Sequence, residues 1–266
     1  MPSSNAVPVL FRKSINRAAS IACLCVPMHA VAIVSMEDVH LGNPPQGFSG
    51  KFALDLSLDG GNTEQGSAST GAKFQWTRDQ LTDFILLNYD YGESNGVTNK
   101  NKGFAHYRHI HQLDARFARE AFTQLSTNRF TALRLRALIG GGVRLTLGEK
   151  TDKQAFFLGL GAFYEHEKLD TDYPDEADTE DRLRASTYLV IKYQFNDYVG
   201  LVSSTYYQPD VADFADYRTY EDLSVVSKLT DNLSLTSGVF VAHDSKPPRD
   251  VKQTDYSLKL GLLLGF

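Results

Sequence analysis

Hydrophobic and polar residues alternate along most of the chain, and the pattern is clearest at the two ends of the region 48–266. In the first stretch the apolar side chains take even positions, at Phe48, Phe52, Leu54, Leu56 and Leu58. The last stretch repeats the pattern with Tyr256, Leu258, Leu260, Leu262, Leu264 and Phe266. A period of two places one row of side chains on each face of an extended strand. Both stretches therefore predict β-strands with one apolar face and one polar face.

Segments with the same period recur throughout this region and give twelve predicted strands. Their expected spans are 48–59, 65–77, 81–91, 103–113, 115–126, 133–147, 154–168, 182–195, 198–208, 217–229, 233–244 and 253–266. Strands of ordinary sheets average about 5 or 6 residues, so these are unusually long. Long strands favour a membrane barrel over a soluble β-sandwich.

The physical reason for a closed barrel is the absence of water inside a bilayer. Every backbone N–H and C=O group in hydrocarbon needs a partner within the protein, and only a sheet that closes on itself has no unpaired edge. The expected fold is therefore all-β, a transmembrane antiparallel up-and-down β-barrel of about 12 strands.

The predicted connections alternate between long and short, as expected for strands that cross a membrane up and down. The long ones are Gly92–Lys102, Leu169–Asp181, Pro209–Asp216 and Ser245–Lys252, which we expect outside the cell. The short ones are Arg78–Gln80, Gly148–Lys153, Asn196–Asp197 and Thr230–Asn232, which we expect in the periplasm with both termini.

Aromatic residues are expected to form girdles where the apolar band meets the lipid headgroups. The candidates are Trp76, Tyr89, Tyr91, Tyr164, Tyr206, Tyr207, Tyr217, Tyr256 and Phe266. Ordinary strands also favour aromatic residues, so these positions add weight to the barrel interpretation without deciding it.

The first residues have the features of a secretory signal peptide. Arg12, Lys13 and Arg17 precede the apolar stretch 18–28, and a small-x-small cleavage pattern ends at Ala32. A single anchoring helix is the alternative interpretation. The predicted organisation is a signal peptide over 1–32, a periplasmic N-terminal segment over 33–47 and an outer-membrane barrel over 48–266.

Composition narrows the possible functions after this leader is removed. Both cysteines, Cys23 and Cys25, lie inside the leader, so no disulfide is expected. Loss of its three basic residues would leave 24 basic and 32 acidic side chains, a net charge of −8, which excludes nucleic acid as a plausible partner. Beyond the leader there is no run of about 18 apolar residues of the kind a membrane helix needs.

Several short stretches resemble a known family. They are LSLDGGNT at 56–63, YDYGE at 89–93, LTDNLSL at 229–235, DSKPP at 244–248 and KQTD at 252–255. In this order and spacing the chain resembles the YdiY-like family of salt-induced outer-membrane proteins, a domain family of unknown function. The resemblance implies a barrel linked to osmotic or salt stress. The terminal strand, with Phe266 at its end, also resembles the signal that outer-membrane barrels present to the barrel assembly machinery.

The strongest candidate for function is a set of charged residues that the alternation directs into the lumen. It consists of Arg134, Arg136, Glu165, Glu167, Arg182 and Arg184, near the outer ends of three consecutive strands. One interpretation is a set of ion pairs that neutralise each other and brace the wall. The other is a constriction that selects ions. Twelve strands lie between the filled eight-stranded barrels and the open porins, so both interpretations stand.

Metal binding is a weaker hypothesis. Asp172, Asp175, Glu176 and Asp178 crowd one outer loop and could hold Ca²⁺ or Mg²⁺, although a solvated loop is the favoured interpretation. His106, His109 and His111 cluster in one strand, and the last two share a face. No further histidine or cysteine completes a zinc site, so no metal and no cofactor is expected.

An enzyme at the extracellular rim, of lipase or protease type, is the alternative function, with His166 or His243 as the base. The chain has no Gly-x-Ser-x-Gly motif, and we expect no enzymatic activity. We expect an outer-membrane barrel that serves envelope maintenance or the narrow passage of small solutes or ions under osmotic stress. Its expected partners are outer-membrane lipid, lipopolysaccharide and, during biogenesis, the barrel assembly machinery.

Overall fold

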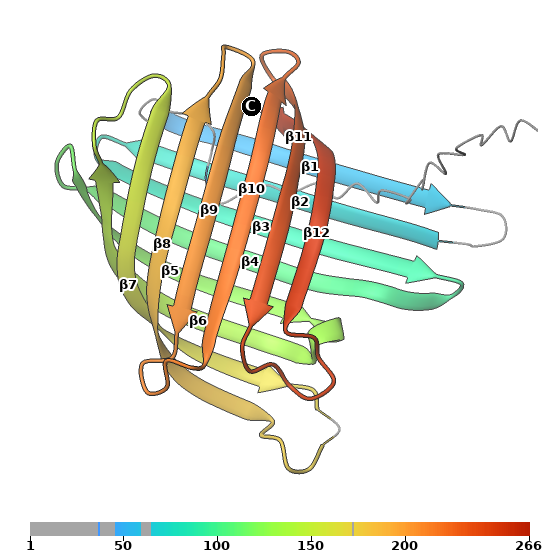
Figure 1. The fold of residues 1–266 in the computed structure, drawn as a ribbon. Coiled ribbons are helices and arrows are strands. Elements are labelled where there is room, and N and C mark those ends of the chain that lie inside the picture. The colour runs from blue at the N-terminus through green and yellow to red at the C-terminus, as the bar shows by residue number, and fades with distance from the viewer. Residues whose placement is uncertain (1–36, 38–45, 60–64, 172) are drawn as a thin grey trace, which may run out of the picture.

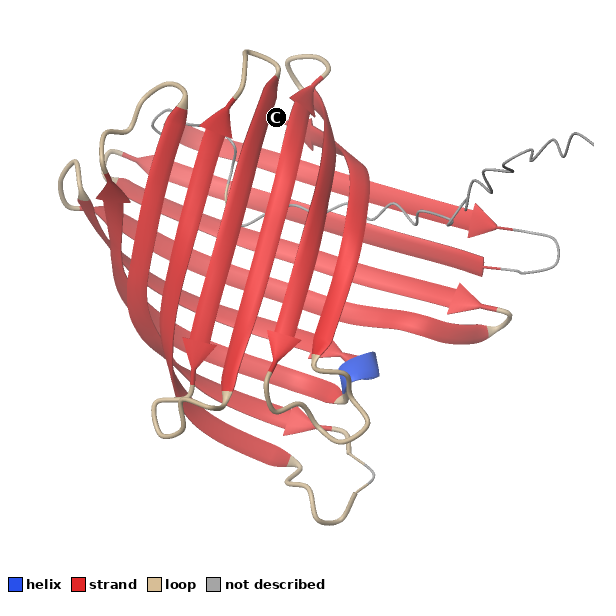
Figure 2. Ribbon diagram, in the orientation of Figure 1, coloured by secondary structure: helices blue, strands red, loops and turns tan. Residues whose placement is uncertain are grey.

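The computed structural model describes residue 37 and residues 46–59, 65–171 and 173–266 of the chain. Twelve antiparallel strands account for most of these residues, together with one short 3-10 helix (Figure 2). The strands are β1 (Gly47–Asp59), β2 (Gln65–Arg78), β3 (Leu81–Ser94), β4 (Val97–Gln112), β5 (Phe117–Asn128), β6 (Leu133–Leu147), β7 (Gln154–Leu169), β8 (Thr179–Gln194), β9 (Val199–Pro209), β10 (Tyr217–Lys228), β11 (Leu233–Asp244) and β12 (Thr254–Gly265). The helix, η1 (Arg129–Thr131), lies between β5 and β6.

Each strand pairs with the next one along the chain, and β12 returns to pair with β1 (Figure 1). The sheet is therefore a closed up-and-down barrel, and the predicted antiparallel fold of twelve strands is confirmed. The observed boundaries lie within three residues of the predicted ones, except at the start of β4.

The barrel has two distinct ends. At the turn end, β1 begins, β12 ends, and the connections are 79–80, 113–116, 148–153, 195–198 and 229–232. At the loop end, the connections 170–178, 210–216 and 245–253 are longer. The predicted alternation of long and short connections is thus correct for three of its four long loops.

The fourth predicted loop, Gly92–Lys102, is wrong. In the structure β3 runs on to Ser94 and β4 starts at Val97, so only Asn95 and Gly96 connect them. Both have positive φ, 50° and 76°, which Asn-Gly supplies readily in a tight hairpin turn. The hairpin contributes to the part of the barrel wall, formed by β1 to β4, that projects beyond the rim (Figure 1).

Burial is inverted relative to a soluble protein. The outward positions carry large apolar side chains that are exposed, such as Ile139 at 65% and Leu183 at 52%. The inward positions carry charged side chains that are buried, such as Glu165 at 0% and Arg184 at 1%. The alternation in the sequence thus becomes an apolar outer surface and a charged interior.

The predicted aromatic girdle is mostly on the outer surface. Trp76, Tyr89, Tyr91, Tyr164, Tyr207, Tyr256 and Phe266 are exposed. Tyr206 is the exception, because its ring contacts the tilted ring of Tyr188 inside the barrel, with ring centroids 5.2 Å apart. Tyr206 occupies an inward position of β9, so its place follows from the same alternation.

A glycine in β7 makes room for the Tyr188 side chain inside the barrel. A Cβ at Gly159 would lie 2.0 Å from the ring of Tyr188 on β8. Only glycine therefore allows this ring to lie against the neighbouring strand. The Tyr188 hydroxyl donates to Glu120 of β5 at 2.5 Å, so the ring reaches over β6 and β7.

The barrel closes at a short seam. The register between β1 and β12 comprises the four pairs from Lys51↔Gly265 to Leu54↔Leu262. Gly50 and Phe266 extend it, because each N–H donates to the other's carbonyl oxygen, at 2.8 and 3.0 Å. The Phe266 ring lies over Gly50, where a Cβ would stand 2.5 Å from two ring carbons.

The predicted signal peptide over 1–32 lies outside the described residues, as does most of the predicted periplasmic segment over 33–47. Glu37 of that segment is described, and it lies inside the barrel rather than beyond its end. Among the described residues, no helix is long and apolar enough to cross a membrane.

We predict that Gly50→Ala weakens the seam, because the added Cβ occupies the space of the Phe266 ring. Overpacking of this kind costs about 1–3 kcal/mol. Guanidinium unfolding of the refolded barrel in detergent should show this loss. Gly265→Ala is the matched control, because its Cβ would meet only the Gly50 carbonyl oxygen, 4.0 Å away. Equal stability of the two variants would contradict the role of the Phe266 contact.

Candidate functional site

The charged interior at the loop end is built from inward positions of five strands and from one loop. Its members, named here the loop-end network, are Arg136, Glu165, Glu167, Arg182, Arg184, Asp210, Asp216, Arg218 and Asp244. The strands place these side chains inward because each of them stands at a position of the inward-facing row of its strand. Four arginines meet five carboxylates in this space.

Glu165 of β7 is the centre of the loop-end network. Arg184 donates from Nε to Glu165 Oε1 at 2.9 Å, and Arg218 donates from Nη1 to the same oxygen at 2.8 Å. Arg136 pairs closely with the other oxygen, Oε2. One buried carboxylate therefore accepts from three guanidinium groups on three different strands.

Arg218 carries the loop-end network across the barrel interior. Its guanidinium group donates two hydrogen bonds to Glu167, from Nη1 to Oε1 and from Nη2 to Oε2, both 2.9 Å long. Strands β8 and β9 lie between β10, which bears Arg218, and β7, which bears Glu167. The side chains therefore meet inside the barrel, over the inner faces of β8 and β9, and occupy part of the lumen.

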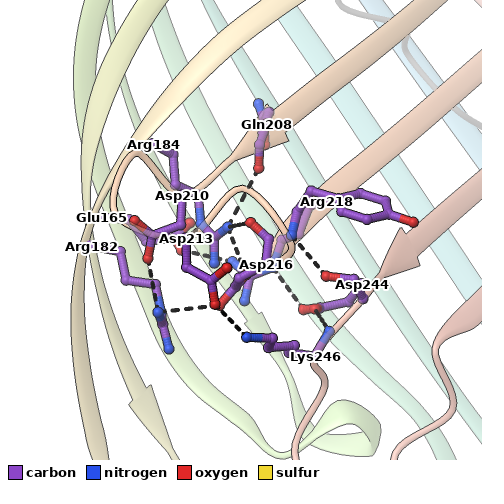
Figure 3. Close-up of polar contacts among 12 residues, drawn as sticks. Glu165, Arg182, Arg184, Gln208, Asp210, Asp213, Asp216, Arg218, Asp244 and Lys246 are labelled. Atoms are coloured by element: carbon purple, nitrogen blue, oxygen red, sulfur yellow. Dashed lines mark hydrogen bonds and ion pairs between the residues drawn. The ribbon is translucent and has the colours of Figure 1, made fainter.

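Two further contacts fix Arg136 and Arg218 in these positions. Arg136 of β6 donates to the Tyr220 hydroxyl of β10 at 2.8 Å, a second link between walls that are not neighbours. Arg218 Nε donates to Asp244 of β11 at 2.7 Å (Figure 3). The loop-end network thus connects β6, β7, β8, β10 and β11.

The connection between β9 and β10 folds inward to complete the loop-end network. Arg184 Nη1 lies 2.9 Å from Asp216 Oδ1, and Arg182 Nη1 lies 2.9 Å from Asp210 Oδ2 and 3.2 Å from Asp216 Oδ2 (Figure 3). The Asp210 N–H donates to the Asp216 carbonyl oxygen at 2.8 Å, which closes this loop on itself.

An exposed ion pair flanks the same loop. Lys246, in the connection between β11 and β12, lies 2.6 Å from Asp213. Its ammonium group, helped by the Ala215 N–H, holds the pKa of Asp213 below its usual value. Because both side chains are about half exposed, this pair adds little to stability.

The six charged residues that the sequence predicted for the lumen do not all lie together in the structure. Arg136, Glu165, Glu167 and Arg184 come together inside the barrel, as the alternation indicated. Arg182 points inward but pairs with Glu180, Asp210 and Asp216 instead of Glu165. Arg134 was wrongly included, because it is exposed and lies at the register shift between Leu133 and Leu135. The bulge breaks the strict period of two on which its placement depended.

Sequence reasoning missed Arg218, Tyr220, Asp210, Asp216 and Asp244. Arg218 and Tyr220 occupy inward positions of β10, so the alternation could have flagged them. Their partnership with β7 crosses the barrel, and strand order alone gives no such contact. Asp210 and Asp216 belong to a loop whose inward fold has no signal in the sequence.

A second group of charges, the turn-end network, lies inside the opposite end. It consists of Glu37, Arg108, Glu120, Arg144, Tyr188 and Lys192. Arg108 Nη1 lies 3.7 Å from Glu120 Oε2, and Arg144 Nη1 lies 3.5 Å from Glu120 Oε1. Arg144 and Lys192 also bind Glu37, the single member that no barrel strand carries.

The predicted histidine cluster is divided between the two faces. His106 points inward and is buried among the rings of Phe84, Phe104 and Phe122. His109 lies 2.8 Å from Asp83, and His111 accepts from Arg119 at 2.8–3.1 Å. The three rings therefore form no common site.

The acidic loop also has partners within the protein. Arg249 Nη2 donates to Asp175 at 2.7 Å, and its backbone N–H donates to Glu176 at 2.8 Å. Asp172 lies outside the described residues. Within the described ranges, no three His, Cys, Asp or Glu side chains are grouped as a metal would require.

The two histidines considered as catalytic bases lie near the loop-end rim. His166 lies 2.8 Å from Asp181, which also accepts from Tyr164 at 2.6 Å. His243 lies 2.9 Å from the Thr254 hydroxyl. Among the contacts of the described residues, neither histidine has a serine or cysteine nucleophile beside it.

Comparisons with known proteins give one family and several barrels. A model of the family described as "Protein of unknown function, DUF481" matches residues 54–266. No curated protein matches the chain. The chain is similar to the NanC porin, with 10% identity, a TM-score of 0.45 and coverage of 82% of this chain and 97% of that one. It is also similar to the translocator domain of autotransporter NalP from Neisseria meningitidis, with 11% identity, a TM-score of 0.44 and coverage of 85% and 90%.

We predict that Glu165→Gln destabilises the barrel strongly, because three buried guanidinium groups lose their shared negative charge. Removing one partner from a buried ionic cluster costs about 3–5 kcal/mol. Guanidinium unfolding in detergent measures this loss. Glu180→Gln serves as the control, because Glu180 is partly exposed and its ion pair among the described residues is with Arg182, so its loss should cost less than about 1 kcal/mol. Similar losses in both variants would contradict the central role of Glu165.

Proposed function

This chain belongs to the DUF481 family of proteins of unknown function, and we propose that it is an integral outer-membrane β-barrel with a narrow, charge-lined passage for small ions or solutes. The observation that carries the proposal is the inverted burial, apolar outside and charged inside. In water this arrangement would expose a continuous apolar surface around the barrel. In a bilayer the apolar outer face contacts lipid, and the charged inner face is kept away from the hydrocarbon.

The length of the strands agrees with a membrane of ordinary thickness. The strands of the barrel have 11 to 16 residues. At about 3.3 Å per residue and a tilt of about 40°, twelve residues rise roughly 30 Å. This matches the hydrocarbon core of a bilayer, which is about 30 Å thick.

The passage is assigned to the loop-end network, where Arg218 meets Glu165 and Glu167 across the lumen. In this proposal the network is the narrowest part of the passage, because buried side chains from five strands of one half of the wall, β6 to β11, project into the lumen there. Rings of fixed charge set the ions that pores admit. A barrel that is only braced, with its lumen permanently closed, is the second candidate, since the same ion pairs fill the interior. The link to salt or osmotic stress, and to envelope maintenance, is part of the proposal and follows from the family resemblance.

We predict that the emission of Trp76 is quenched in vesicles whose acyl chains carry bromine. Trp76 is the only tryptophan of the chain, and its side chain is exposed on the outer face of β2. In the matched control, Trp76→Phe combined with Phe84→Trp, the indole moves to an inward position of the adjacent strand β3 and should escape quenching. Equal emission of both proteins in brominated and ordinary vesicles would contradict insertion in the membrane.

We predict that Arg218→Gln raises single-channel conductance several-fold in planar bilayers and shifts selectivity toward cations. The change removes the link across the lumen and leaves Glu165 and Glu167 with one fewer cation. Lys246→Gln is the control, because its ion pair with Asp213 lies outside the constriction. If neither the original protein nor the Arg218 variant conducts, the passage is refuted and the braced barrel is supported.

A further inference from the structure

A carboxylate from outside the barrel strands is bound inside the turn end of the lumen. Glu37 precedes β1 in the sequence, yet its side chain is buried against β6 and β8. Arg144 donates from Nη1 to Oε1 at 2.6 Å and from Nη2 to Oε2 at 3.2 Å. Lys192 Nζ lies 3.0 Å from Oε2. Both carboxylate oxygens are therefore held, in the two-point geometry typical of arginine and carboxylate.

The barrel itself positions the two cations that hold this carboxylate. Phe157 of β7 lies between them, with its ring centroid 4.0 Å from Arg144 Cζ and 5.7 Å from Lys192 Nζ. Glu120 lies on the other side of Arg144 and is itself fixed by the Tyr188 hydroxyl at 2.5 Å. The guanidinium group is thus oriented by strand residues, whatever occupies the space next to it.

The charge balance of the turn-end network calls for an anion at this point. Among the described residues of this network, the barrel strands contribute three cations, Arg108, Arg144 and Lys192, against one carboxylate, Glu120, and the buried Lys73 of β2 adds a further positive charge that acts on Glu37. Buried charges are costly unless they are paired, so the excess favours binding of a further anion. Glu37 supplies that anion in this structure.

We propose that Arg144 and Lys192 form a binding site for a small soluble carboxylate, and that Glu37 is its intramolecular occupant. A solute of this class would displace the Glu37 carboxylate and make the same three contacts. A role for this site in permeation rests on the proposed function, and the solutes that pass would then be anionic carboxylates. As a binding site, it stands on the contacts of Arg144 and Lys192 alone.

The test uses residues 33–266, the chain without its predicted signal peptide, in detergent. The substitution Glu37→Ala leaves Arg144 and Lys192 in place and removes the carboxylate that occupies their site. Thermal unfolding is followed over a series of sodium acetate concentrations, with sodium chloride at equal ionic strength as the control. We expect the variant to unfold at a lower temperature than the original protein in chloride. Acetate should raise the unfolding temperature of the variant along a saturable curve. The unfolding temperature of the original protein should change little with acetate.

A second variant separates binding from screening of charge. In Glu37→Ala combined with Arg144→Gln, the two-point contact is lost, and acetate should have no advantage over chloride. If chloride restores the single variant as well as acetate does, or if acetate acts equally on the double variant, the site is refuted. Should Glu37→Ala not fold in chloride, the refolding yield becomes the readout, and acetate but not chloride should raise it.

The outcome is independent of the conductance experiment. Acetate binding without currents would support the site and refute the passage. Currents without an acetate-specific effect would support the passage and refute the site.

Discussion

Closure of the sheet at the seam between β1 and β12 is the constraint on which the rest of the structure depends. A sheet with two open edges would leave backbone N–H and C=O groups unpaired, which hydrocarbon does not tolerate. Here the first and last strands pair through four residues each, and Gly50 and Phe266 add two reciprocal hydrogen bonds. Once the sheet is closed, every strand has an inside and an outside, and the alternation of the sequence acquires a physical meaning.

The interior that closure creates is filled with charge, and this requires compensation. A buried ion is stable only when partners satisfy its charge and its hydrogen bonds. Glu165 achieves this with Arg136, Arg184 and Arg218, whereas Arg182 relies on carboxylates from the β9–β10 loop. Because the partners come from strands that are distant along the sheet, the same contacts that neutralise the charges also tie the walls together.

The two networks differ in the sign of their excess charge, and this bears on what could move between them. The loop-end network joins four arginines to five carboxylates, and the strands at the turn end supply more cations than anions. Aromatic side chains also point into the barrel, among them Phe163 of β7 and Tyr206, whose ring contacts Tyr188 of the turn-end network. In the proposed function, a solute meets a salt-bridged constriction at one end and a carboxylate-binding pair of cations at the other.

The sequence by itself determined the number of strands, the face that most residues take and most of the connections, because a period of two depends only on local backbone geometry. It also placed Arg136, Glu165, Glu167 and Arg184 on the inner face. An Asn-Gly pair was a readable signal for the β3–β4 turn, and the longer loop predicted there was wrong. Tertiary structure decided what local periodicity cannot carry: the bulge that exposes Arg134, the reach of Arg218 across the lumen, the inward fold of the β9–β10 loop and the position of Glu37. These depend on which walls face each other once the barrel has closed, and that is set by the curvature and closure of the whole sheet.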